Sequence, residues 1–347
     1  MKQGSAVHQK LEDQVHTTVP VTAETKEDKW GLRIWNVIQG LRTLRETGQT
    51  RELEIWGTVD GLVVNGIIDE LTYICPDAEL EESLQGPKKS KKDILPTDQV
   101  SISEYFKKAG TTSIAEATRS KRRAESNKIY ICDVKTRSAR TLPKGAAFRP
   151  TQMQLMLYHH LLSALATNTV DFSVLTSRYN LDPTATFSDS FIAEVGSLND
   201  EFFYDAVSNP SQSSTPEPIS TPDSLTTLTA HNNLSLLWSL MISEFRLTLP
   251  DGASSLGNVL KAEYRSRETG SVIGSKTIPM DDTGLQAYVK HEMQWWRGER
   301  QAEGVVVEEA FKCRSCDFAE GCEWRLKKIE EGLEKARLAR KRRTSNV

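Results

Sequence analysis

Apolar side chains recur with a helical period over several stretches of the chain. Six of them fall on one face of a predicted helix over residues 27–46: Trp30, Ile34, Val37, Ile38, Leu41 and Leu44. The same spacing predicts four further helices, over residues 4–16, 151–166, 232–248 and 282–300. A highly charged stretch over residues 323–343 predicts a basic helix near the C-terminus.

Between these helices the apolar period changes to that of strands. Residues 51–57 alternate, and residues 62–73 are rich in β-formers, with a turn signal at Asn65–Gly66, so a hairpin is predicted here. Residues 128–137 form a short apolar strand of the buried type, and residues 261–279 predict a pair of strands. Helices that alternate with strands in this way indicate an α/β fold.

Two stretches break the pattern. Residues 77–128, with a basic run at Lys88–Lys92, are typical of an inserted excursion, and residues 208–224 form a loop rich in Pro, Ser and Thr. We therefore expect one domain over residues 1–324, followed by a basic helix or tail over 325–347. The core of the expected domain lies at about residues 50–75 and 128–170, and a cysteine loop occupies residues 311–324 of the same domain.

The composition adds limits rather than a function. The 347 residues are 38% hydrophobic and 26% charged, which is enough apolar material for a globular core. The net charge is only −3, so nucleic-acid binding would have to come from a local basic patch. No stretch approaches the roughly 20 apolar residues of a membrane-spanning helix, and we expect no membrane partner. The first residues lack a signal-peptide core and an Arg/Ser-rich transit peptide.

Three of the five cysteines, Cys313, Cys316 and Cys322, fall within one short loop. In a reducing compartment a Cys-x2-Cys unit is more often a pair of metal ligands than a disulfide. A tetrahedral zinc or an iron–sulfur cluster takes four protein ligands, so this group is one ligand short. The spacing alone leaves zinc and iron–sulfur both open.

A second constellation lies on the predicted strands. Asp133 and Lys135 are two positions apart and therefore project to one side, where a neighbouring strand can bring Asp69 beside them. Two carboxylates form a magnesium or manganese site, and a lysine at its edge can orient or deprotonate a water or stabilise charge on a phosphate. An isolated Asp-x-Lys is usually an ordinary strand with outward charges, but these carboxylates end apolar, buried-type runs and need partners.

Two further pairs sit one helical turn apart. His8, beside Glu12, could supply an additional ligand to the same metal, although an exposed His–Glu pair is an equally good interpretation. Gln154 and Tyr158 could bind a substrate phosphate or base, or hold the lysine. From spacing alone, a plain amphipathic helix is favoured for the second pair.

Taken in order, these residues resemble a known family. The sequence carries His8 after Gly4-Ser-Ala-Val, Gly66-Ile-Ile-Asp69, Asp133-Val-Lys135-Thr-Arg137, Gln154-x3-Tyr158 and a terminal Cys-x2-Cys-x5-Cys. This combination is similar to the exonuclease V, or defects-in-morphology, family. That family belongs to the iron–sulfur, RecB-like branch of the PD-(D/E)xK nucleases. The resemblance implies a restriction-endonuclease-like core, with a central mixed sheet flanked by helices and a C-terminal iron–sulfur cysteine loop.

The resemblance also implies an activity and a site. Eukaryotic relatives degrade single-stranded DNA from its ends, with fungal members in mitochondria and animal members in nuclear repair. Asp69, Asp133 and Lys135 would be the catalytic core, and Gln154 and Tyr158 the motif that follows it. His8, Asp69 and Asp133 would bind Mg²⁺ or Mn²⁺, Arg137 would meet the DNA backbone, and Cys313, Cys316 and Cys322 would hold a [4Fe-4S] cluster.

One ligand of that cluster has no counterpart. Relatives carry the first cysteine upstream of the His-bearing helix, whereas Cys75 and Cys132 are poorly placed to replace it. We expect the missing ligand, and any targeting segment, to precede Met1, and the chain as it stands to bind iron poorly. The expected partners of this monomer are single-stranded DNA and a single-strand DNA-binding protein, in the mitochondrion or the nucleus. A DNA-binding scaffold without catalysis and a zinc-ribbon interaction module are the alternatives.

Overall fold

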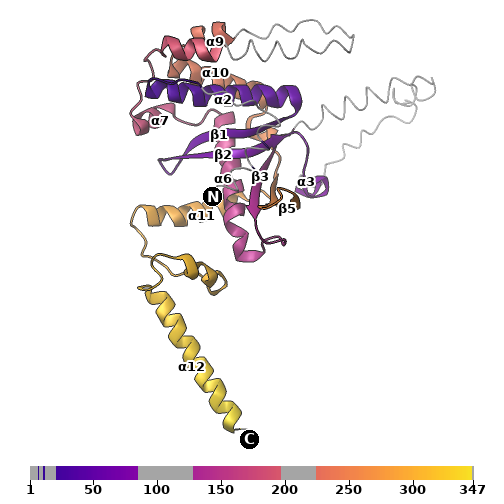
Figure 1. The fold of residues 1–347 in the computed structure, drawn as a ribbon, viewed down its shortest axis with the longest axis vertical. Coiled ribbons are helices and arrows are strands. Elements are labelled where there is room, and N and C mark those ends of the chain that lie inside the picture. Colours follow the sequence, from indigo (N-terminus) through magenta and orange to yellow (C-terminus); the bar gives the residue numbers. More distant parts are fainter. Residues whose placement is uncertain (1–6, 8–10, 12–20, 85–127, 197–223, 346–347) are drawn as a thin grey trace, which may run out of the picture. The chain divides into compact units, whose positions relative to one another are not determined.

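The computed structural model describes residues 7, 11, 21–84, 128–196 and 224–345 (Figure 1). The chain forms two compact units: residues 1–142 with 154–281, and residues 143–153 with 282–347. Its helices include α2 (Lys26–Thr47), α3 (Ala78–Leu84), α6 (Arg149–Ala166), α7 (Phe172–Tyr179), α9 (Ser224–Ala230), α10 (Leu234–Thr248), α11 (Asp282–Trp296) and α12 (Glu323–Ser345). The described residues also include three 3-10 helices, η1 (Gly145–Ala147), η2 (Gly252–Ser255) and η3 (Val307–Ser315).

The first unit holds a five-stranded sheet. Its strands lie in the order β1 (Gln49–Val59), β2 (Leu62–Thr72), β3 (Tyr130–Arg137), β4 (Val259–Ser266) and β5 (Val272–Pro279). The β3–β4 pair is parallel and the other three pairs are antiparallel. The predicted α/β class, with a central mixed sheet flanked by helices, is therefore confirmed.

The β1–β2 hairpin turns at a different place from the one predicted. Asp60 and Gly61 have φ values of 52° and 81° and connect the paired residues Val59 and Leu62, as in a two-residue turn with two left-handed positions. The turn predicted at Asn65–Gly66 is wrong, because Gly66 lies inside β2, opposite Ile55. The hairpin itself, and the strand predicted over residues 128–137, are confirmed.

The predicted helix over residues 27–46 is present as α2, and it forms much of the core. Thr25 and Asp28 make a reciprocal capping box at its N-terminus, which satisfies backbone groups that the first turn leaves without partners. All six apolar residues predicted on its inner face are buried. Trp30 packs against Trp56 of β1, which in turn contacts Trp238 of α10. Aromatic contacts thus join two helices to the first strand.

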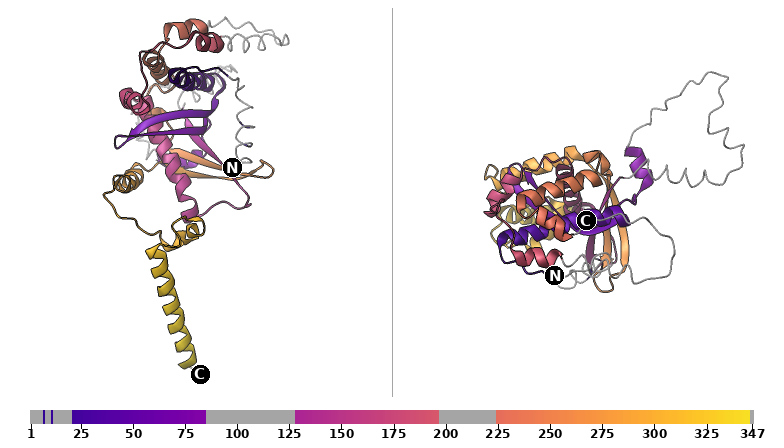
Figure 2. Two further views of the ribbon diagram at one scale, coloured as in Figure 1. Left: turned by 60° about the vertical axis from the view of Figure 1, so that its left-hand side comes forward. Right: turned by 90° about the horizontal axis from the view of Figure 1, so that it is seen from above.

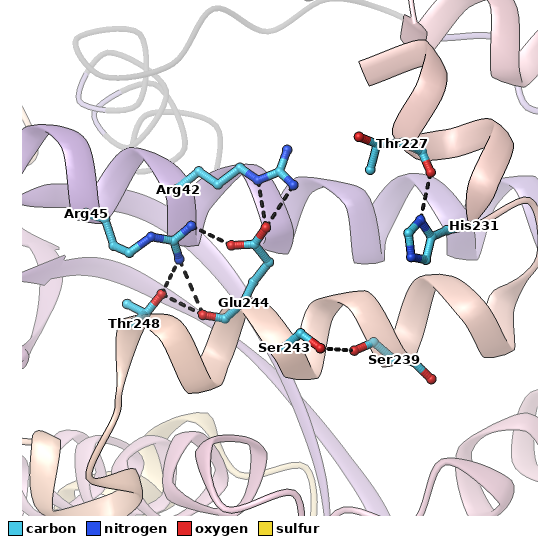
Figure 3. Close-up of polar contacts among 8 residues, drawn as sticks. All are labelled: Arg42, Arg45, Thr227, His231, Ser239, Ser243, Glu244 and Thr248. Carbon is cyan, nitrogen blue, oxygen red and sulfur yellow. Dashed lines mark hydrogen bonds and ion pairs between the residues drawn. The ribbon is translucent and has the colours of Figure 1, made fainter. Parts of the chain in front are cut away.

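An ionic cluster fastens α10 to α2, two helices that lie beside one another in Figures 1 and 2. Arg42 donates to Glu244 Oε1 from Nε at 2.9 Å and from Nη2 at 2.8 Å. Arg45 donates to the other carboxylate oxygen of Glu244 and to the hydroxyl of Thr248 (Figure 3). Because Glu244 is buried, these charge-assisted hydrogen bonds replace the water that its carboxylate loses.

A second buried carboxylate, that of Glu81 in α3, ties three chain segments together. Its Oε1 accepts a hydrogen bond from Lys128 Nζ at 2.7 Å. Its Oε2 accepts from the backbone N–H groups of Asn258 and Val259, at 3.0 and 3.1 Å. Helix α3, the approach to β3 and the start of β4 therefore meet at one side chain.

The remaining predicted elements agree with the structure to within a few residues. Helices α6 and α10, the β4–β5 pair and α12 are present. The helix predicted over residues 282–300 ends earlier, at Trp296, because a turn follows in which Gly298 N–H bonds to the Trp295 carbonyl. Most of the predicted helix at 4–16, residues 85–127 of the predicted excursion and all but the last residue of the loop at 208–224 lie outside the described residues; the start of the excursion forms α3. No helix in the described part of the chain is long and apolar enough to cross a membrane.

Candidate active site

Strands β2 and β3 separate at the position of Asp69. Their backbone pairing runs from Thr72/Tyr130 to Glu70/Cys132. The next N–H group on that side of β3, from Val134, donates instead to Asp69 Oδ2 at 2.5 Å. A carboxylate thus takes the place of a backbone acceptor in the ladder, and this brings Asp69 to the edge of β3.

Asp133 and Lys135 extend from β3 next to this junction. Asp133 is 1% exposed, and Lys135 Nζ lies 3.0 Å from both of its carboxylate oxygens. Burial lowers the pKa of Lys135, but the charges of Asp133 and Asp69 outweigh this, so its pKa lies above its ordinary value. The lysine is therefore a cation at neutral pH, which suits charge stabilisation better than proton removal.

Helix α6 adds Tyr158 and Gln154 to the group. Gln154 Nε2 donates to Tyr158 Oη at 2.7 Å, so the two side chains contact each other, while their predicted contact with substrate stays a prediction. Burial raises the pKa of Tyr158, and with the charges of Asp133 and Asp69 it outweighs the lowering by the Gln154 hydrogen bond and the Lys135 charge. The tyrosine therefore keeps its proton at neutral pH and can donate a hydrogen bond.

Gly66 explains how the tyrosine ring reaches this place. A Cβ atom built on Gly66 would lie 2.5 Å from Tyr158 Cε1, a distance that real side chains do not allow. The Tyr158 ring, which α6 carries, therefore packs directly against the backbone of β2 at Gly66. The motif containing Gly66 and Asp69 thus combines a space for Tyr158 with a carboxylate three residues later.

The donor set fits a divalent cation. Asp69 and Asp133 bring two carboxylates to one ammonium group, that of Lys135, and hard cations such as Mg²⁺ prefer carboxylate oxygens and retain several waters. Among the described residues there is no group of three or more His, Cys, Asp or Glu side chains that could hold a metal. His8, the third predicted ligand, lies outside the described residues.

Arg137 occupies the last position of β3. Its guanidinium carbon lies 5.8 Å from the centre of the Tyr264 ring, and its carbonyl accepts a hydrogen bond from Arg267 N–H at 3.0 Å. Residues 133, 135 and 137 alternate along one strand and so share a face. The predicted contact between Arg137 and DNA stays a prediction.

Sequence reasoning missed a charged row on β4, the strand next to β3. Lys261 and Arg265 both bond to Glu263, at 2.9 and 2.7 Å. Cys132 is the register partner of Lys261 and is buried, which raises the pKa of its thiol. Alternating Lys-x-Glu-x-Arg on a predicted strand was the available signal for this row.

The three clustered cysteines belong to the second unit. Cys313 lies in η3, Cys316 directly follows it, and Cys322 precedes α12. All three are free thiols, and in the described part of the chain they do not form a group that could hold a metal. The donor atoms suit iron or zinc, but the structure does not bring them together as ligands. The predicted cluster remains a prediction.

Comparison with known proteins identifies the family. The model of the family described as "Exonuclease V - a 5' deoxyribonuclease" matches residues 1–325, almost the whole chain. The chain belongs to the exonuclease V family. The matched region includes the five strands, α6 and all three clustered cysteines.

Members of the exonuclease V family from animals and yeasts are recognisably similar to this chain. "Exonuclease V" of Danio rerio is 20% identical over 322 residues, which is 93% of this chain and 61% of the relative. "Exonuclease V, mitochondrial" of Candida albicans (strain WO-1) is 27% identical over 81 residues, 23% of this chain and 13% of that protein. The Candida dubliniensis protein of the same name is 31% identical over 68 residues, 20% and 11% respectively. The chain thus spans about three fifths of the Danio rerio relative and much less of the yeast ones.

Proposed function

We propose that this exonuclease V family member is a metal-dependent nuclease that hydrolyses phosphodiester bonds in DNA. The observation that carries the proposal is the junction of β2 and β3, where Asp69 accepts the Val134 N–H and Asp133 contacts Lys135. Two carboxylates and one lysine at separating strands are the groups that hydrolysis of a charged ester needs. Family membership supports the same activity.

Each residue has a separate task in this proposal. Asp69 and Asp133 would hold the divalent cation, which supplies activation of a water and polarisation of the phosphate. Lys135, fixed by Asp133, places its ammonium group where it can offset negative charge on the reacting phosphate. Tyr158 stays neutral and, with Gln154, lines the same place from α6.

The proposed substrate is single-stranded DNA entered from an end. The family's description as a 5′ deoxyribonuclease supports DNA as the substrate and a 5′ preference. Arg137 supports backbone recognition, because it follows Lys135 on the same face of β3 and guanidinium groups bind phosphate well. The mitochondrial names of the yeast relatives support a mitochondrial location, with the nucleus as the alternative.

The test is cleavage of end-labelled DNA by the purified chain with and without Mg²⁺. We expect linear single strands to be shortened, and circular single strands, duplexes and RNA to be cut slowly. Asp69→Asn, Asp133→Asn and Lys135→Ala should each lose cleavage, while Asp189→Asn, which changes an exposed aspartate elsewhere in the same unit, should not. Retained DNA binding without cleavage in the unmodified chain would contradict the enzyme and favour a binding scaffold.

We also propose that Cys313, Cys316 and Cys322 are ligands of an iron–sulfur cluster with a fourth ligand from elsewhere. Their Cys-x2-Cys-x5-Cys spacing within the matched family region supports this. The test is iron and sulfide content after anaerobic purification: the chain, one ligand short, should hold less than a full four-iron complement, and Cys316→Ser should hold less still. A colourless protein that binds zinc through the same thiols would contradict it.

A further inference from the structure

We propose that Glu52 of β1 is a positioning residue: its left-handed backbone sets Asp69, directly opposite in the hairpin, against β3. The inference rests on the proposed function, since it concerns the same site. It adds a residue that neither the motifs nor the metal-binding groups include.

The hairpin ladder is interrupted at one pair. Arg51 pairs with Glu70, and Leu53 pairs with Ile68, so the register is the same on both sides. The pair between them would be Glu52 with Asp69, and the ladder skips it. Glu52 has φ 51°, which non-glycine residues rarely adopt and which is foreign to a regular strand. The irregularity therefore lies directly across from Asp69.

The side chains of β1 show the same break. A Cβ atom built on Gly40 of α2 would lie 2.8 Å from a methyl carbon of Leu53 and 3.3 Å from the hydroxyl oxygen of Thr50. In a regular strand, residues three apart point to opposite faces. Thr50 and Leu53 reach the same point of α2, so the alternation of β1 is reset between them, where Glu52 lies. A local break in a strand can redirect side chains, as β-bulges do next to active sites, although here the register is kept.

On the other side of the hairpin, Asp69 is directed sideways. Side chains of a regular strand stand roughly perpendicular to the sheet, whereas the Asp69 carboxylate reaches in the plane to Val134 N–H, at 2.5 Å. Because the ladder skips the Glu52–Asp69 pair, β2 can shift locally at Asp69 while the flanking pairs stay fixed. The break in β1 thus allows the Asp69 carboxylate to accept the hydrogen bond from Val134 of β3.

In this proposal Glu52 acts through its backbone conformation and not as a metal ligand. Across the described residues, no three acidic, histidine or cysteine side chains form a metal-holding group, so Glu52 does not join Asp69 and Asp133 as a third ligand. Glycine adopts a positive φ without steric cost, whereas a β-branched residue such as valine strongly resists it. Glu52→Gly should therefore keep the break, and Glu52→Val should pull β1 toward a regular strand.

A matched control exists in the same hairpin. Asp60 has φ 52°, almost the angle of Glu52, but lies in the turn, away from Asp69. Asp60→Val imposes the same backbone conflict and a comparable loss of stability. Comparing Glu52→Val with Asp60→Val separates an effect on the site from a general cost of forcing valine into a left-handed position.

The first measurement is hydrogen–deuterium exchange of the Val134 amide, resolved by NMR. In the full chain without DNA, Glu52→Val should speed this exchange at least about tenfold, to the level of Asp69→Ala. Glu52→Gly and Asp60→Val should stay within about threefold of the unmodified chain. If Glu52→Val leaves Val134 as protected as Asp60→Val does, the positioning role is wrong.

The second measurement is steady-state cleavage of labelled single-stranded DNA. Glu52→Val should lower kcat about tenfold with little change in KM, because a misplaced carboxylate affects the reaction more than binding. Glu52→Gly should retain kcat, and a loss there as large as in Glu52→Val would show that the side chain, not the backbone, matters. If the unmodified chain fails to cut DNA, the proposed function fails, while Val134 exchange still decides the role of Glu52.

Discussion

The α2–α10 cluster and the β2–β3 junction both bury carboxylates beside cations, with opposite charge balance. At α2–α10, Glu244 is held by two guanidinium groups, one on each carboxylate oxygen. At the junction, Asp69 and Asp133 share one ammonium group, that of Lys135. The first arrangement closes a helix interface, whereas the second leaves a surplus of negative charge that a divalent cation can complete. Burial and ion pairing alone would not have separated a structural cluster from a candidate active site.

The largest expected effect is on the carboxylate side of this comparison. Asp133→Asn removes one of the two negative charges beside Lys135 and should lower the rate of DNA cleavage about 10³-fold, in the range of lost preorganised charges. Labelled-strand kinetics at saturating Mg²⁺ measure it. Thermal unfolding should change far less than the rate. A variant with near-normal cleavage would show that Asp133 does not take part in the chemistry.

At the α2–α10 interface we expect the reverse, a loss of stability without a loss of DNA cleavage. Glu244→Gln leaves Arg42 and Arg45 without their buried counter-ion and should lower the free energy of unfolding by about 2–3 kcal/mol. Urea denaturation measures this, and cleavage per folded molecule should be unchanged. Glu54→Gln is the control, because its partner Arg33 is 31% exposed, and we expect a loss of about 1 kcal/mol or less.

Between these extremes lies a change that should affect both properties. Gly66→Ala places a methyl group against the Tyr158 ring and should lower stability by about 1–3 kcal/mol, with some loss of cleavage as the ring moves away from Asp133. The same substitution at Gly332 meets no atom within 4 Å and serves as the control. Denaturation and cleavage assays on both variants measure the effect. Equal results for the two would contradict the close packing of Tyr158 over β2.

The smallest expected effect tests a buried carboxylate held by neutral donors. Burial raises the pKa of Asp28, but hydrogen bonds from Ser188 and Thr25 outweigh it, and its pKa lies below the ordinary value. A lowered folded-state pKa gives stability that is present above the unfolded-state pKa and is lost as pH falls through the folded value. Asp28→Asn should therefore cost about 1 kcal/mol near neutral pH and progressively less in acid.

Urea denaturation over a pH series from about 7 to about 2 measures the Asp28 effect. Asp171→Asn is the control, because Asp171 makes its capping bond on the surface of α7, where asparagine caps equally well. A gap between Asp28→Asn and the unmodified chain that widened in acid would reverse the expected sign.

Local patterns predicted most of the fold and part of the site. The six apolar positions of α2 and the run through β3 were sufficient, because helical and buried-strand periods are local properties of the sequence. The approach of Asp69 to Asp133 followed from motif order and strand geometry. The hairpin turn was misplaced because Asn65–Gly66 has turn chemistry, whereas Gly66 is needed to accommodate a ring from α6, a contact that distant residues make.

The unpredicted parts of the site are those in which the backbone departs from its regular form. Nothing in the residues around Glu52 signals a positive φ inside a strand, because its neighbours Arg51 and Leu53 continue an ordinary alternating strand pattern. The sequence likewise could not show that Val134 N–H would bond to a side chain instead of to a strand. Both features depend on how two strands diverge, and only the assembled sheet determines that.

The tie between Glu81 and Lys128 bears on how the family can vary. Glu81 lies shortly before residues 85–127 in sequence and Lys128 directly after them, and the 2.7 Å ion pair joins these two flanking positions. Closing a longer flexible loop costs only about 0.6 kcal/mol for each doubling of its length. Evolution could therefore lengthen, shorten or replace this segment without disturbing Asp69 and Asp133, which lie on either side of it in sequence. We expect large differences in length among relatives to collect at this point.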